Sequence, residues 1–330
     1  MAFAKILEEL RDKAVFITGG TGFFGKNLLS LFQQTKQAGL NIRVGVLSRN
    51  AERFQKDFPQ LSEGVTFHHG DIESFEFPKE NYDYIIHAAT HVAGRQHNQD
   101  PAFMLNNMIV GIQRVLDFAE SCGTKRILHT SSGAVYGEQP RELYHIPENN
   151  CWSPYTSDVK SAYGEGKRVS EMLGTLFSKR TGIEFVNARC FAFLGPYLPL
   201  DSNYAIGNFI LNGLRDENII IKGDGTPRRS YMYATDLVEW LLTILIFGEN
   251  TQSYNVGSDI DYSIKEVAEK VKEFFPKIKI ETQSTLKFKD KPLRYVPSIE
   301  KAKNDLGLKV NVQISDGIDR FLLNYKKKGV

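Results

Sequence analysis

Residues 18–25 read TGGTGFFG and directly follow the apolar run at residues 14–17. Gly19, Gly22 and Gly25 stand three residues apart, and an amphipathic stretch begins where they end. A glycine-rich turn between a strand and a helix lets the backbone approach a pyrophosphate closely, and the first N–H groups of the helix attract the anion. A tight turn without a ligand has the same composition, but the strand before it and the helix after it favour binding. The motif therefore predicts a dinucleotide site at the start of an α/β sheet.

Short β-branched or apolar runs alternate with helical patterns along the chain. The expected strands span residues 14–18, 43–47, 65–68, 84–88, 126–130 and 184–188. The expected helices span residues 25–37, 101–122, 161–181 and 235–247. This alternation predicts a Rossmann-type, doubly wound parallel α/β sheet that binds its ligands outside the carboxyl ends of the strands.

The composition of the chain changes near residue 189, where prolines and glycines become frequent and a lysine-rich region follows. We expect a cofactor-binding domain over residues 1–188, to which residues 231–257 return. A smaller C-terminal α/β lobe, formed by residues 189–230 and 258–330, is expected to bind the substrate against it.

The bulk composition excludes several classes of protein. The 330 residues are 42% hydrophobic and 24% charged with a formal net charge of +2, which indicates a globular protein with neither nucleic acid nor a membrane as its partner. Cys122, Cys151 and Cys190 form no CxxC pair, which is typical of free thiols in a reducing compartment. No metal-ligand cluster, secretion signal or apolar run of about 18 residues is present, so we expect a cytoplasmic protein without a metal.

Two further motifs carry groups that can perform chemistry. Tyr163 and Lys167 stand four residues apart in YGEGK, on one face of an expected helix. A neighbouring ammonium favours ionisation of a phenol whose ordinary pKa is about 10, although an exposed tyrosine beside a solvated lysine is the simpler alternative. The run TSSGAVYG at residues 130–137 places hydroxyls at the end of an expected strand, where they form either a substrate site or an ordinary serine-rich turn.

With these three motifs in this order, the chain resembles the extended short-chain dehydrogenase/reductase family. The resemblance is to its NAD(P)-dependent nucleotide-sugar epimerases, dehydratases, decarboxylases and reductases, and it covers nearly the whole chain. It also includes HGDI at 69–72, IIHAAT at 85–90, ARCFAFLGP at 188–196, GDGTPRRSYMYATD at 223–236 and YNVGS at 254–258.

The resemblance implies a catalytic role for three residues. Tyr163 would be the general acid/base, and Lys167 would lower its pKa and hold the nicotinamide ribose. Ser132, which stands four residues before Tyr136 as the family's catalytic Ser or Thr does, would hydrogen-bond the reacting oxygen. The chemistry would be hydride transfer between a sugar carbon and the nicotinamide, coupled to proton transfer.

The resemblance also implies binding residues. Those for the cofactor are Gly19, Gly22, Phe23, Phe24, Gly25, Ser48, Arg49, Asn50, Asp71, Ile72, Ala88, Ala89, Thr90, Ser131, Tyr163 and Lys167. Those for a nucleotide-diphosphate sugar are Ser132, Gly133, Asn208, Arg229 and Arg294, the two arginines meeting the diphosphate. The chain departs from the family pattern at Ala192, where Asn is common, and at Asn107, which is shifted by one position.

The end of the second strand bears on the choice of cofactor. Ser48 stands where NAD-binding proteins usually carry an acid, and Arg49 follows it. A missing carboxylate and a nearby guanidinium favour NADP over NAD, with NAD as the alternative.

The residues after Ser132 bear on the reaction. Dehydratases of the family carry an Asp-Glu pair where Gly133 and Ala134 stand, and decarboxylases carry Glu in place of Ala134, so both reactions are disfavoured. The favoured activity is NADPH-dependent reduction of a 4-keto (6-deoxy)hexose nucleotide in surface-polysaccharide biosynthesis. The alternatives are a C4 epimerase with retained NAD and a non-catalytic NADP-binding regulator. The family also implies a homodimer joined by a four-helix bundle, to which helices near residues 101–122 and 161–181 would contribute.

Overall fold

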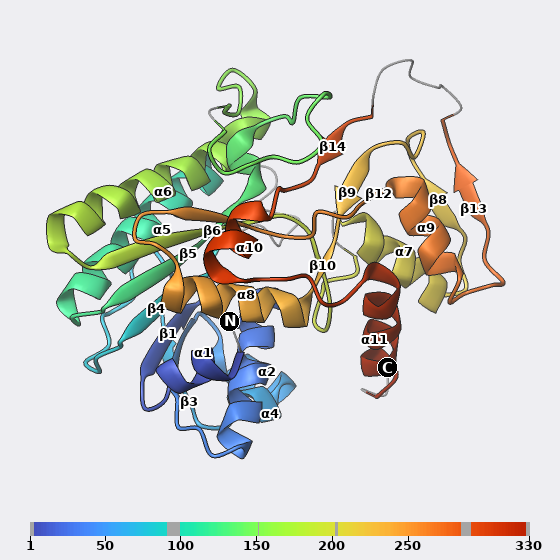
Figure 1. The fold of residues 1–330 in the computed structure, drawn as a ribbon. Coiled ribbons are helices and arrows are strands. Elements are labelled where there is room, and N and C mark those ends of the chain that lie inside the picture. Colours follow the sequence, from blue (N-terminus) through green and yellow to red (C-terminus); the bar gives the residue numbers. More distant parts are fainter. Residues whose placement is uncertain (1–2, 91–99, 151, 202–203, 285–291, 328–330) are drawn as a thin grey trace.

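The computed structural model describes residues 3–90, 100–150, 152–201, 204–284 and 292–327, and a seven-stranded parallel sheet is its centre (Figure 1). The strand order is β11-β6-β5-β4-β1-β2-β3, and every neighbouring pair is parallel. The strands are β1 (Ala14–Thr18), β2 (Arg43–Ser48), β3 (Val65–His69), β4 (Tyr84–His87), β5 (Arg126–Ser132), β6 (Glu184–Cys190) and β11 (Ser253–Val256). The predicted Rossmann-type fold class is confirmed.

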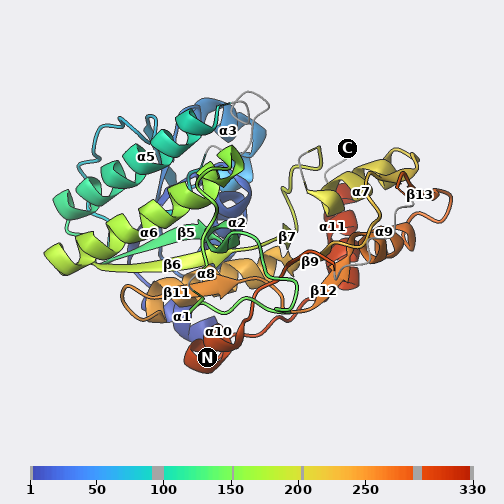
Figure 2. The ribbon, with the colours of Figure 1, turned by 90° about the horizontal axis from the view of Figure 1, so that it is seen from above.

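Helices cover both faces of this sheet (Figure 2). One face carries α5 (Pro101–Ser121) and α6 (Ala162–Thr181), and the other carries α1 (Phe3–Glu9), α2 (Phe23–Gln37) and α8 (Ala234–Phe247). Shorter helical segments are α3 (Ala51–Asp57), α4 (Pro59–Ser62), η2 (Gly133–Tyr136) and η3 (Val159–Ser161). None of the helices in the described ranges is long and apolar enough to cross a bilayer.

The two cores follow from the alternation of side chains along each strand. On β1, Phe16 packs into the core under α5 and α6, whereas Val15 and Ile17 pack into the core under α2 and α8. Cys122 and Cys190 are buried free thiols, and Cys151 lies outside the described residues.

Helix α6 packs closely against its neighbours because glycines face them. A Cβ on Gly166 would stand 2.3 Å from Met108 Cε of α5, and a Cβ on Gly174 would stand 2.0 Å from the ring of Phe185 on β6. Gly182 ends the helix in the left-handed conformation, with a φ of 78°. This close packing fixes the height of α6 above the sheet.

The remaining elements form a smaller lobe beside the carboxyl ends of the strands (Figures 1 and 2). They include β7 (Phe193–Leu194), α7 (Ala205–Leu214), β8 (Ile219–Ile221), β9 (Arg228–Ser230), β10 (Met232–Tyr233), β12 (Asp261–Ser263), α9 (Ile264–Lys272), β13 (Ile280–Thr282), β14 (Arg294–Tyr295) and α11 (Ile314–Lys327), while α10 (Glu300–Leu306) returns to the sheet. Just after β14, Val296 O accepts the Ile146 N–H at 2.9 Å, and Ile146 O accepts the Ser298 N–H at 2.8 Å. These bonds tie β14 to the loop that follows η2, so the lobe reaches the ends of β5 and β6.

Candidate active site

The glycine-rich loop joins β1 to α2 and presses against the end of β4. Gly19 has a φ of 75°, and a Cβ there would lie 2.6 Å from the Ala88 carbonyl. Gly22 is the N-cap of α2, and among the residues that the structure describes no side chain caps the helix there. The residues thus fit a dinucleotide, because first-turn N–H groups without a side-chain acceptor remain available to its phosphates.

The other expected residues of this loop contribute backbone rather than side chains. The ring of Phe24 packs edge-on against Phe193, and the ring of Phe23 lies 5.8 Å from that of Phe24. A Cβ on Gly25 would stand 2.3 Å from Gly20, so the start of α2 is held tightly against the loop. Both phenylalanine rings face the cores, which leaves the loop backbone to meet a ligand.

The end of β2 is organised differently from the expectation. Ser48 Oγ accepts the Asn50 N–H at 3.2 Å, and Asn50 Oδ1 in turn caps α3 through the Arg53 N–H at 3.0 Å. Arg49 forms an ion pair of 3.6 Å with Asp71. The guanidinium that favoured a 2′-phosphate is therefore already matched by a carboxylate.

The residues expected beside the cofactor just after β3 and β4 adopt two kinds of environment. Ile72 is buried and packs against Gly111 of α5, beside the expected cofactor site. Ala88 donates its N–H to Thr18 O at 3.0 Å, and Ala89 donates to Thr18 Oγ1 at 3.3 Å. These hydrogen bonds continue the contact between β1 and β4 past the end of β4, next to the glycine-rich loop.

The three expected catalytic residues converge at the end of β5. Burial raises the pKa of Tyr163, and the neighbouring Ser132 hydroxyl acts in the opposite direction. Lys167 Nζ donates to Thr130 O at 2.7 Å and to Thr90 Oγ1 at 2.8 Å. The ammonium thus points to the ends of β4 and β5, on the side of the glycine loop.

Lys167 is a buried cation, with only 3% of its surface exposed. Burial lowers its pKa to about 8, and the charge of Glu171 opposes the shift. The Cys190 thiol acts in the same direction as Glu171, but burial raises its own pKa to about 12, so it is neutral at pH 7. Lys167 is therefore close to titration near neutral pH.

The smaller lobe supplies a second hydroxyl that the sequence did not single out. Burial raises the pKa of Tyr295 of β14, the neighbouring Ser132 hydroxyl acts in the opposite direction, and the Tyr295 ring lies 4.7 Å from that of Phe191. A Cβ on Gly133 would stand 2.7 Å from both the Tyr295 hydroxyl and the Phe191 ring. The wall beside Ser132 is therefore aromatic and leaves no room for a side chain at position 133.

The two expected substrate arginines have different surroundings. Arg229 donates to Arg228 O at 2.8 Å and lies over the Tyr295 ring, and among the described residues it forms no ion pair with a carboxylate. Burial lowers its pKa. Arg294 is paired with Asp261 and lies over the Tyr144 ring, 4.6 Å from its centroid. Arg229 is thus the cation left for an anionic ligand.

Asn208 lies within α7 and donates its backbone N–H to Tyr204 O at 3.1 Å. Tyr204 precedes the helix, and its charge state acts on Tyr163 and Tyr295. The start of α7 therefore borders the site, but in the described part of the chain no hydrogen bond joins the Asn208 side chain to the catalytic residues.

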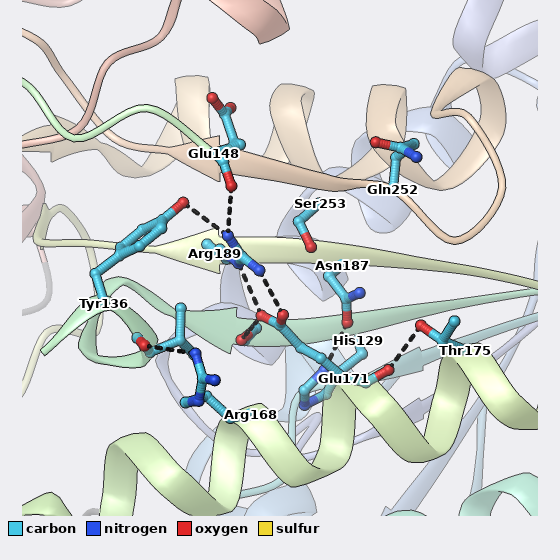
Figure 3. Close-up of polar contacts among 12 residues, drawn as sticks. His129, Tyr136, Glu148, Arg168, Glu171, Thr175, Asn187, Arg189, Gln252 and Ser253 are labelled. Atoms are coloured by element: carbon cyan, nitrogen blue, oxygen red, sulfur yellow. Dashed lines mark hydrogen bonds and ion pairs between the residues drawn. The ribbon is translucent and has the colours of Figure 1, made fainter. Parts of the chain in front are cut away.

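A buried polar network lies one turn further along α6 (Figure 3). Arg189 of β6 binds both oxygens of Glu171, with Nε–Oε1 at 3.0 Å and Nη2–Oε2 at 2.7 Å. Arg189 Nη1 also donates to Tyr136 Oη at 2.9 Å and to Glu148 O at 3.1 Å. Ser131, expected to contact the cofactor, donates its hydroxyl to Glu171. Sequence reasoning missed this network because its bonded residues are 18 to 53 positions apart.

Comparisons with known proteins show the family to which the chain belongs. Residues 15–257 match the model of the NAD dependent epimerase/dehydratase family. UDP-glucuronic acid decarboxylase 6 of Arabidopsis thaliana is 30% identical over 305 residues, 92% of this chain and 86% of the relative. UDP-glucuronic acid decarboxylase 1 of Danio rerio is 27% identical over 98% of this chain and 75% of its own length.

Solved structures share the fold. The UDP-glucose 4-epimerase of Thermotoga maritima, solved with UDP-glucose, has a TM-score of 0.82 at 21% identity, covering 96% of this chain and 100% of its own. A dTDP-glucose 4,6-dehydratase of Streptomyces venezuelae, solved with NAD, has a TM-score of 0.77 at 21% identity, covering 95% and 97%.

These findings correct the expected reaction. The assignment as a reductase, together with the exclusion of decarboxylation and dehydration, is wrong, because the similar relatives are UDP-glucuronic acid decarboxylases and the matching family model is that of epimerases and dehydratases. The expectation rested on Arg49, which is paired with Asp71, and on the missing acid at Ala134. A 4-keto acid needs no such acid to lose CO₂, so its absence is a weak argument.

Proposed function

The chain belongs to the NAD-dependent epimerase/dehydratase family, and we propose that it oxidises a UDP-sugar at C4 and restores its cofactor within the same catalytic cycle. The observation that carries the proposal is the convergence of Ser132, Tyr163 and Lys167 at the end of β5. UDP-glucuronic acid, named in the relatives, is the first substrate to test.

The mechanism follows from what the side chains can reach. Ser132 would bind the C4 oxygen while Tyr163 removes its proton, and the Lys167 charge would favour the phenolate. The chemistry that NAD supplies when bound is acceptance and return of a hydride at C4. With a glucuronic acid, the C4 ketone makes the C6 carboxylate part of a β-keto acid, which loses CO₂ to leave an enolate. A proton from water at C5 restores the C4 ketone before the hydride returns. Tyr163 would then return the proton to the C4 oxygen.

A second candidate reaction is epimerisation at C4. It requires the 4-keto sugar to present its other face before the hydride returns. The aromatic wall of Phe191 and Tyr295 beside Gly133 supports this candidate, because it offers few polar groups that would hold the sugar in one orientation.

We propose NAD as the cofactor, with the phosphates on the glycine loop and the nicotinamide ribose beside Lys167. The Arg49–Asp71 pair supports NAD over NADP, because the Asp71 carboxylate competes for the guanidinium that a 2′-phosphate would need. Calorimetry with NAD and NADP checks this. Asp71→Asn should improve NADP binding, and tighter binding of NADP than NAD by the unaltered protein would contradict it.

The decisive experiment incubates the protein with NAD and either UDP-glucuronic acid or UDP-glucose, with mass spectrometry of the products. Loss of CO₂ or formation of the C4 epimer without net NADH supports the proposal, and the Tyr163→Phe variant should form neither. Net change of the nicotinamide in proportion to product would contradict it.

The outer surface of α5 and α6 supports a homodimer through a four-helix bundle. Phe103, Met172 and Leu176 expose 42%, 59% and 56% of their surfaces on these two helices. Light scattering on the eluted protein measures the mass. Met172→Lys with Leu176→Lys should give the monomer, and a monomeric wild type would contradict the dimer.

A further inference from the structure

Glu171 occupies a place that links the catalytic helix to the catalytic strand. It lies on α6, one turn after Lys167 and two turns after Tyr163, and only 12% of its side chain is exposed. Its carboxylate accepts the hydroxyl of Ser131, the chain neighbour of Ser132. One side chain therefore connects the helix that carries the acid/base to the strand that carries its partner.

The same carboxylate reaches the turn after Ser132 through Arg189. The guanidinium holds Glu171 and also the Tyr136 hydroxyl at the end of η2 (Figure 3). Tyr136 in turn donates to Asn255 Oδ1 of β11 at 2.8 Å. The residues on both sides of Ser132 are thus tied to Glu171, directly at Ser131 and through Arg189 at Tyr136.

Stability alone is a poor account of this arrangement. Removing two charges from water costs several kcal/mol for each ion, and apolar residues of similar volume often serve stability equally well. Position matters more to catalysis, because a misplacement of about 1 Å can cost about 10²-fold in rate.

The charge of Glu171 also acts on Lys167. The titratable groups whose charges are coupled to Lys167 come from four elements: His87 of β4, His129 of β5, Cys190 of β6 and Glu171 of α6. Burial lowers the pKa of both histidines and raises that of the thiol, so these three are neutral near pH 7. Glu171 then carries the charge that favours the ammonium.

We propose that Glu171 is a positioning residue of the catalytic centre, which holds Ser131 and hence Ser132 at a fixed place beneath Tyr163 and keeps a negative charge one turn from Lys167. This role rests on the proposed function. It predicts two separable effects, one on geometry through Ser131 and one on charge through Lys167.

The test compares Glu171→Gln, Ser131→Ala and Glu165→Gln. Glu165 lies on the same helix, 3.7 Å from Arg168, and provides the matched control. Glu171→Gln should lower kcat by about 10 to 100-fold and move the alkaline limb of kcat/KM to lower pH. Ser131→Ala, which leaves the Glu171–Arg189 pair intact, should lower kcat by about 10-fold without moving that limb. Glu165→Gln should change neither.

A readout without turnover separates this proposal from the proposed function. NMR of ¹³C-labelled lysine follows the titration of Lys167, whose signal is the one lost in Lys167→Met. In Glu171→Gln the titration should move to lower pH, and in Glu165→Gln it should not. An unchanged titration, or a kcat loss no larger than the loss of folded protein, overturns the role of Glu171. If the wild type converts no UDP-sugar, the proposed function fails, and the Lys167 titration still decides for or against Glu171.

Discussion

Lys167 and Glu171 stand one turn apart on the buried face of α6, and the protein surrounds their charges in opposite ways. Lys167 donates to a hydroxyl and a carbonyl, and burial lowers its pKa to about 8. Glu171 meets the guanidinium of Arg189 with both oxygens, and this pairing outweighs burial and raises the pKa of Arg189. A buried cation without a carboxylate is held at a cost and is available to a ligand, whereas a paired charge fixes geometry.

The largest effect on activity is expected from a change at Tyr163, one turn before Lys167 on α6. Tyr163→Phe removes the hydroxyl that exchanges the proton and keeps the ring, so kcat should fall by about 10²- to 10⁴-fold with little loss of stability. Product formation and thermal unfolding measure the two quantities. A variant that keeps a large share of the activity would remove Tyr163 from the mechanism.

Breaking the Glu171–Arg189 pair should lower the stability of the protein. Arg189→Met leaves the Glu171 carboxylate buried without its partner, and the free energy of unfolding should fall by about 3–5 kcal/mol. The matched control is the double variant Glu171→Met/Arg189→Met, which should lose much less because no charge is left unpaired. Urea denaturation measures both, and a double variant as unstable as the single one would break the comparison.

The contrast also shows how far local patterns reach. The sheet, the glycine loop and the Tyr163/Lys167 spacing were predictable, because each depends on residues close in sequence. The Glu171–Arg189 pair joins a helix to a strand, and Tyr295 approaches Ser132 from a lobe more than 160 positions away. Such contacts depend on packing, which no short motif encodes.

The same limit explains the error over the reaction. Arg49 looked available for a phosphate when considered with its neighbours in sequence, but Asp71, at the end of the next strand, pairs with it. The surroundings of Gly133 were hidden from the sequence in the same way, because only the fold shows that Tyr295 and Phe191 fill the space beside it.

Replacing Lys167, which forms no ion pair among the described residues, with an uncharged residue should increase the free energy of unfolding. The difference between a pKa of 10.5 and one of about 8 corresponds to about 3 kcal/mol for burying the charge of Lys167. Two hydrogen bonds of about 1 kcal/mol each are lost, so Lys167→Met should be more stable by about 1 kcal/mol at pH 7 while it loses activity.

The pH dependence of stability should show whether the charge of Lys167 lowers the free energy of unfolding. Between pH 8 and 10.5 the unfolded chain binds more protons at Lys167 than the folded protein, so the wild type gains stability as the pH rises. The advantage of Lys167→Met should therefore shrink over this range in denaturation measured at several pH values. An advantage that grows with pH would contradict the buried, protonated lysine.

A last pair of variants tests whether the same rule holds in the second lobe, where Arg229 has no carboxylate partner among the described residues and Arg294 is paired with Asp261. Arg229→Met should weaken UDP binding by about 10- to 100-fold, the loss of a charge-assisted hydrogen bond, and leave stability unchanged. Arg294→Met should cost about 1 kcal/mol of stability, since Asp261 keeps Arg228 at 2.7 Å, and change the Kd for UDP little. Calorimetry and thermal unfolding separate the two. If Arg294→Met weakens UDP binding as much as Arg229→Met, a paired cation also serves the ligand, and the rule drawn from α6 does not extend to this lobe.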